Sequence, residues 1–252
     1  MSMNYLKQNM QLKIINMDFN NNENYQNITT IDNTQELVRV AFYKKTYLHV
    51  AFGVLAFILI EYLFLHTEAI VKFTLSLAQG KMWLLMLGGF MLATSFAEKM
   101  AVTSTDRSKQ YIGYLIYIVA EAFIFVPILY IASVYVAGPV IQQAAVLTLG
   151  LFTGLSAVVL LTKKDFSFLR TAITVGSFIA IGLIIAGLLF GFNLGLWFSA
   201  GMIVLAAGSI LYQTSNLLHK YRTDQYVAAA LGLFASLMLL FWYILRILMS
   251  RK

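Results

Sequence analysis

Long stretches without a charged residue dominate the second half of the chain and predict membrane spans. Between Glu121 and Lys163 there are 41 consecutive uncharged residues, and between Arg170 and Lys220 there are 49. A helix crosses a hydrocarbon core of about 30 Å with roughly 20 apolar residues. Each stretch is therefore long enough for two crossings.

The same pattern predicts seven transmembrane helices along the whole chain. Turn-forming residues divide the two long stretches, at Gly138-Pro139 in the first and at Gly191 to Asn193 in the second. No segment alternates polar and apolar residues, and a chain in lipid must satisfy its backbone hydrogen bonds internally, which favours helices. The predicted helices are residues 46–66, 82–98, 111–134, 141–162, 169–190, 194–216 and 226–248. The predicted fold class is an all-α integral membrane protein, a bundle of seven transmembrane helices.

The composition supports this interpretation. Hydrophobic residues make up 60% of the chain and charged residues 12%, whereas soluble domains carry roughly 45–50% and about 25%. A water-soluble surface cannot be built from so few charges. The chain has no cysteine, which excludes disulfides, thiolate metal sites and cysteine nucleophiles.

The positions of the basic residues predict the orientation and the domains. Of the 18 Lys and Arg residues, 13 lie in the N-terminal segment and in the second, fourth and sixth loops, and five lie elsewhere. Cytoplasmic segments are the ones enriched in Lys and Arg, so we expect a cytoplasmic N-terminus. Residues 1–38 contain nine Asn and predict a disordered cytoplasmic tail. Residues 39–252 form the predicted seven-helix domain.

Two glutamates fall inside predicted spans, where an ionisable side chain is costly and therefore a functional candidate. Glu121 lies six residues before Pro127, whose ring removes a helical hydrogen bond and bends the helix. This combination fits a polar cavity with a cation or proton site, and equally a protonated carboxyl group that hydrogen-bonds a neighbouring helix. Glu61, late in the first span, fits either the same site or a carboxylate that snorkels to the outer interface.

Polar residues also gather at the end of the sixth span. Gln213 to Asn216 are four uncharged polar residues in a row. They can line a water-filled vestibule, or they can cap the helix and bond across the bundle. His219 follows at the predicted membrane surface, either as a pH sensor or as an ordinary solvated histidine.

Small residues recur at a spacing that predicts close helix packing. Gly150 and Gly154 have GxxxG spacing in the fourth predicted span, and Gly187 and Gly191 have it at the end of the fifth. Glycine at this spacing lets two helix backbones approach each other.

One sequence pattern belongs to enzymes. Gly154 to Ala157 reads GLSA and is similar to the GxSx nucleophile of rhomboid intramembrane proteases, which pair that serine with a histidine two helices later. The nearest candidate base for Ser156 is His219, which lies outside the predicted membrane core and thus at the wrong depth. An intramembrane serine protease is therefore a remote alternative. Walker, HExxH and EF-hand motifs are absent from the sequence, so we predict no catalytic, metal or cofactor site.

Two segments carry a family resemblance. Leu161 to Leu169 reads LTKKDFSFL and contains Lys163, Lys164 and Asp165, and Gly208 to His219 reads GSILYQTSNLLH. Together with the alanine-rich last span, they resemble the Bax inhibitor family, the transmembrane Bax-inhibitor-motif proteins, and within it the bacterial YccA-like branch.

The resemblance covers about residues 40–250 and implies a seven-helix bundle with a cytoplasmic N-terminus. It also implies an ion path, because members of the calcium-leak type use two aspartates on the sixth and seventh helices as a proton-switched gate. Their positions match Gln213 and Ser236, neither of which ionises, so the switch is not carried over. With Glu121 and Glu61, these two residues form our candidate intramembrane polar site.

The YccA-like branch implies binding and slowing of the membrane AAA protease FtsH, with an exposed N-terminal tail contributing to that contact. We therefore predict a non-enzymatic, multi-pass protein of the bacterial inner membrane that modulates membrane-protein quality control through an FtsH-type partner, without a cofactor or nucleic acid. The alternative is a pH-sensitive leak of cations, calcium in particular, or of protons. That alternative gains support if Glu121 faces a cavity lined by Gln213 and Ser236.

Overall fold

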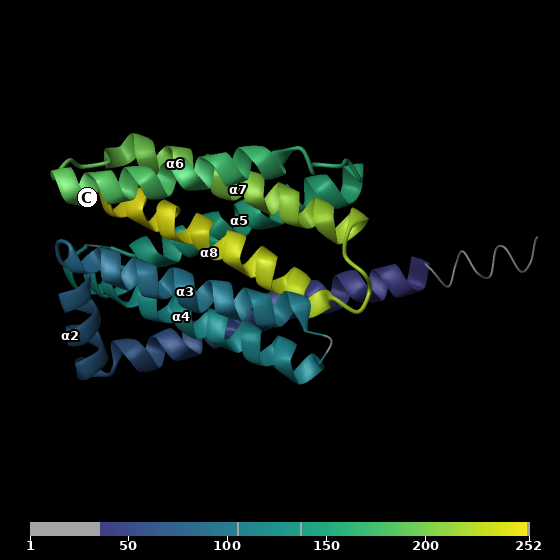
Figure 1. Ribbon diagram of the computed structural model, residues 1–252, viewed down its shortest axis with the longest axis horizontal. Coiled ribbons are helices and arrows are strands. Elements are labelled where there is room, and N and C mark those ends of the chain that lie inside the picture. Colours follow the sequence, from purple (N-terminus) through teal and green to yellow (C-terminus); the bar gives the residue numbers. More distant parts are fainter. Residues whose placement is uncertain (1–35, 105, 137, 251–252) are drawn as a thin grey trace, which may run out of the picture. The chain divides into compact units, whose positions relative to one another are not determined.

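The computed structural model of this protein describes residues 36–104, 106–136 and 138–250. Within these ranges seven helices are long and apolar enough to cross a membrane, one for each predicted span. They are Glu36–Leu65, α3 (Met82–Thr103), α4 (Arg107–Tyr135), α5 (Val140–Thr162), α6 (Leu169–Phe190), α7 (Gly195–His219) and α8 (Tyr226–Ser250) (Figure 1). The predicted fold class is confirmed, and the chain is a multi-pass membrane protein. The cytoplasmic position of the N-terminus stays a prediction.

The predicted tail, residues 1–38, lies outside the described residues except for Glu36 to Val38, which are helical. Several helices are longer than the spans predicted for them. The first already contains Glu36, ten residues before the predicted start, and α3 continues to Thr103, five residues past the predicted end. A run of uncharged residues marks only the part of a helix that lies in the hydrocarbon core. The helix itself continues into the headgroup region, because it satisfies its backbone hydrogen bonds internally.

A short helix, α2 (Glu68–Leu77), occupies the connection between the first two spans and was not predicted. It is amphipathic: Val71 and Thr74 are buried, while Glu68 and Lys72 form an exposed ion pair one turn apart. A search for long stretches without charged residues misses such a helix, because a short amphipathic helix carries charged residues on one of its faces. The α2 helix packs against α4 and α3.

The chain divides at Lys44 into two compact units, and all that follows concerns the unit from Lys45 onward. In that unit α8 is the central helix: 78% of its most apolar window is buried, against 6% for α6 and 50% for α4. Figure 1 shows α8 passing between the α6 and α7 pair and the α3 and α4 pair. Its neighbours in contact are α7, α5, α4 and α3, so most helices of this unit pack around α8.

Local sequence explains where several helices begin or end. The α4 helix is capped by Asp106, whose carboxylate accepts a hydrogen bond from the Ser108 amide at 2.9 Å. The α5 helix ends at Lys163, which adopts a left-handed conformation with φ of 52°, and α6 ends at Gly191 with φ of 76°. The left-handed region favours glycine and terminates helices, so the predicted turn at Gly191 is confirmed.

Candidate functional site

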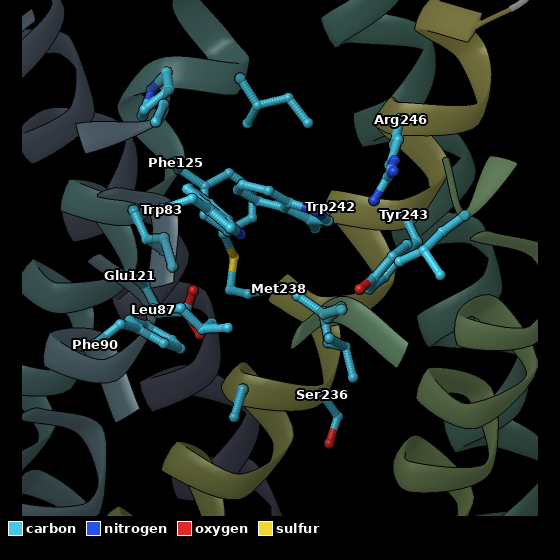
Figure 2. A pocket seen from close by; sticks show the side chains of 18 of the residues that line it. Trp83, Leu87, Phe90, Glu121, Phe125, Ser236, Met238, Trp242, Tyr243 and Arg246 are labelled. Carbon is cyan, nitrogen blue, oxygen red and sulfur yellow. The ribbon is translucent and has the colours of Figure 1, made fainter. Parts of the chain in front are cut away.

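A cavity of about 1010 Å³ lies against α8 and is lined by α3, α4, α6, α7 and α8. Three of the four residues predicted as an intramembrane polar site line it: Glu121 from α4, Gln213 from α7 and Ser236 from α8. Figure 2 shows Glu121 and Ser236 in the cavity wall. The structure therefore brings together residues 115 positions apart in the sequence. The cavity is only partly enclosed, and it joins Glu121 with Gln213 and Ser236, which is the arrangement that favours the leak alternative.

Glu121 lies on the face of α4 that lines the cavity. Its side chain has an exposed fraction of 6%, and its carboxyl group accepts a hydrogen bond from the Tyr117 hydroxyl one turn earlier. Glu98 of α3 also lines the cavity and is near enough to Tyr117 to interact with it electrostatically. Two acidic side chains therefore share this end of the cavity.

Sequence reasoning missed Glu98 and Tyr117. Glu98 is the last residue of the second predicted span, so the search for charges inside spans did not single it out. A tyrosine four residues before a buried carboxylate is nevertheless a usable signal, because residues at i and i+4 are neighbours on a helix.

Gln213 of α7 and Ser236 of α8 are neutral residues of the cavity wall, and both contact other residues there. The Ser236 hydroxyl donates to the Gly232 carbonyl at 2.9 Å and lies 2.8 Å from the Ser209 hydroxyl. The Gln213 side chain lies directly over Gly232, where a Cβ would stand 2.8 Å from its Oε1. That buried oxygen has no hydrogen-bond partner among the described residues, so it is a free acceptor in the cavity wall.

Aromatic rings form the middle of the cavity wall. The Trp242 ring stacks on Trp83 with centroids 6.1 Å apart and meets Phe125 edge-on at 4.9 Å. Figure 2 shows these three rings together, with Glu121 to one side of them and Arg246 to the other. Since Phe125 is one helical turn from Glu121, the rings begin about 6 Å along α4 from the carboxylate.

Glu61 is not among the residues that line this cavity. The structure buries it, with an exposed fraction of 4%, and both carboxyl oxygens lack a hydrogen-bond partner among the described residues. The interpretation of Glu61 as a snorkelling carboxylate is therefore wrong. The reason is its helical position: it follows Val50, Gly53 and Phe57 on the buried face of the first helix.

The loop that follows α5 and contains Lys163, Lys164 and Asp165 is hydrogen-bonded to the end of α7. The Ser215 hydroxyl donates to the Asp165 carboxylate at 3.1 Å and accepts from the Phe166 amide at 2.9 Å. Asp165 also accepts from the Ser167 amide at 2.8 Å. Hydrogen bonds from Ser167, and then from Ser215, hold the pKa of Asp165 below its usual range. Lys163, Lys164 and Asp165 are all exposed.

The four polar residues at the end of α7 thus divide between several partners. Gln213 lines the cavity, the Thr214 hydroxyl lies 3.5 Å from that of Ser156, and Ser215 holds the loop. Asn216 is buried, and its side-chain oxygen has no hydrogen-bond partner within the described residues. Thr214 and Ser215 therefore bond to other parts of the bundle, while a water-filled vestibule at Gln213 stays a prediction.

Ser156 and His219 do not form a nucleophile and base pair. Ser156 is buried with an exposed fraction of 3% and contacts Thr214, while His219 lies at the last residue of α7 and interacts electrostatically with Asp165. Ser156 also lies six residues before the last residue of α5, about 9 Å along the helix axis. This geometry does not support His219 as the general base of Ser156.

Comparison with known proteins places the chain in a family. Residues 39–252 match the family model described as the inhibitor of apoptosis-promoting Bax1. A 111-residue segment is 40% identical to an uncharacterized protein of Pseudomonas aeruginosa and covers 44% of this chain and 50% of that one.

Two named relatives match a segment of similar length. The modulator of FtsH protease YccA from Escherichia coli is 36% identical over 112 residues, which are 44% of this chain and 51% of YccA. The Golgi anti-apoptotic protein of Vaccinia virus is 34% identical over 113 residues, 43% of this chain and 46% of the viral one. The matched segments span about half the length of these curated relatives.

Proposed function

The chain belongs to the Bax inhibitor family, and from that premise we propose that it is a non-enzymatic regulator of a membrane-embedded AAA protease of the FtsH type. It acts in the bacterial inner membrane, with its N-terminus in the cytoplasm, and modulates the turnover of membrane proteins. The observation that carries this proposal is the 36% identity to the Escherichia coli modulator of FtsH protease. The neutral residues Gln213 and Ser236, at the positions of the family's gating acids, also favour a regulator over a calcium gate.

Co-purification from mild detergent tests this function. We expect the tagged full chain to recover an FtsH-type protease, and a variant lacking residues 2–35 to recover less, because the tail is the segment that the protease would engage. A tagged seven-helix protein of another family serves as the control for non-specific capture. Failure of both forms to recover any AAA protease would contradict the proposal.

A second function is favoured by the cavity that joins Glu121 with Gln213 and Ser236. We propose that protons pass through it, with Glu121 exchanging a proton between the two ends of the bundle. Calcium is a poorer candidate, because it takes six to eight oxygen ligands, and the described residues contain no cluster of three or more acidic, His or Cys side chains.

Proton flux into liposomes that contain the purified full chain tests this second function. Glu121→Gln removes the exchangeable proton while retaining the size of the side chain, so we expect it to lower the flux at least tenfold. Glu68→Gln, a substitution at an exposed residue of α2, is the matched control and leaves the flux unchanged. An unaltered flux in Glu121→Gln would remove the proposed proton site.

A further inference from the structure

We propose that the cavity around Glu121 is a binding site for a lipophilic organic monocation, a molecule with one delocalised positive charge and apolar or aromatic substituents. The positive charge of the ligand lies at Glu121, and its apolar or aromatic substituents lie against Trp83, Phe125 and Trp242. Neither protease regulation nor proton passage requires such a ligand. The inference therefore goes beyond the proposed function, although it uses the same carboxylate as the second candidate.

The size of the cavity fits an organic molecule rather than a bare ion. Its volume is about 1010 Å³, at the upper end of the roughly 300–1,000 Å³ of drug-sized ligand sites. Such sites are largely apolar, with a few polar groups that orient the ligand. The lining here has this character: it consists mainly of leucines, isoleucines and aromatic rings, and its polar members are Glu98, Glu121, Asn193, Gln213, Arg246 and a few hydroxyl groups.

The charge of the site favours a cation. Among the described residues, the one Lys or Arg that lines the cavity is Arg246, which lies ten residues beyond Ser236 on α8. Figure 2 shows Arg246 and Glu121 on opposite sides of the aromatic rings. Glu121 is thus a buried acid whose hydrogen-bond partner is a neutral hydroxyl group, that of Tyr117. A bound cation would supply the missing counter-ion.

The rings beside the carboxylate define the kind of cation. Tyr117, Glu121 and Phe125 follow one another at intervals of four residues along α4 and all line the cavity. Phe125 meets Trp242, which in turn stacks on Trp83. Aromatic faces attract cations and do so best in a site without water. A metal ion needs several oxygen ligands, whereas a delocalised organic cation needs one carboxylate and ring faces.

The membrane supplies a route for such a ligand. Lipophilic cations dissolve in the bilayer, and the cavity is open. Two of its walls are α3 and α6, and these two helices do not pack closely against each other. We therefore infer that the ligand enters from the lipid between these two helices.

Fluorescence of the purified full chain in detergent tests the proposal directly. Two of the three tryptophans, Trp83 and Trp242, line the cavity, while Trp197 has an exposed fraction of 89%. In a Trp197→Phe background, the signal therefore comes from the cavity alone. We expect tetraphenylphosphonium to change this signal saturably, and tetraphenylborate, of the same shape and opposite charge, to give no saturable change after subtraction of empty micelles.

Variants locate the charge. Glu121→Gln should weaken tetraphenylphosphonium binding at least tenfold, and Phe125→Leu should weaken it several-fold, whereas Glu68→Gln should bind like the parent. Equal binding of the two ions to the parent, or unchanged binding in Glu121→Gln, would overturn the proposal.

The comparison of the two ions needs no variant of Glu121, so the proposal remains falsifiable even if Glu121→Gln does not fold. The assay contains neither protease nor proton gradient. Loss of protease capture or of proton flux therefore leaves its result unaffected.

Discussion

At the scale of single residues, the two buried glutamates of the described chain have opposite surroundings. Glu121 has the Tyr117 hydroxyl and a cavity beside it. Glu61 is equally buried, yet both of its oxygens are without a partner in the part of the chain that the structure describes. A buried polar group without a hydrogen bond lowers the free energy of unfolding by about 1–3 kcal/mol. Glu61 therefore destabilises this unit.

Replacing Glu61 by leucine, which has a similar volume, should therefore stabilise the protein by about 1–3 kcal/mol. The measurement is the thermal unfolding midpoint in detergent, followed by circular dichroism. Glu68→Leu, at an exposed position of α2, is the control and should change the midpoint little. A lower midpoint for Glu61→Leu would mean that the carboxyl group has a stabilising partner in the folded protein.

At the scale of helices, the glycine that brings two backbones together is not in a GxxxG pair. A Cβ on Gly113 of α4 would stand 2.6 Å from the carbonyl oxygen of Ala97 in α3. Added Cβ atoms on Gly150 and Gly154 would meet nothing within 4 Å. The prediction of close packing at that pair is thus wrong within the described residues, because spacing alone does not say which face of a helix is buried.

Gly113→Ala should therefore destabilise the protein by about 1–3 kcal/mol, since extra volume at a tight contact shifts backbone or side chains. Gly150→Ala is the matched control. It should be neutral or stabilise by up to about 1 kcal/mol, because alanine favours helix more than glycine does. The midpoints of thermal unfolding give both values, and equal effects of the two substitutions would argue against tight packing of α3 on α4.

At the scale of the whole molecule, the sequence predicted the seven spans because bilayer thickness is a one-dimensional constraint that a charge count can detect. The cavity is different, since it depends on which faces of α4, α7 and α8 meet. Glu121 could be singled out as a charge within a span, and Gln213 and Ser236 through the family resemblance. Trp83, Phe125 and Trp242 could not be identified, because aromatic residues in a span are equally suited to face lipid.

The central position of α8 has a consequence for how the protein is made. Chains are synthesised from the N-terminus, so α3, α4, α5 and α7 leave the ribosome before the helix around which they pack. Until α8 inserts, it cannot cover the face of α4 that carries Glu121 or the face of α7 that carries Gln213. The helices made earlier therefore reach their final packing only after α8 has entered the membrane.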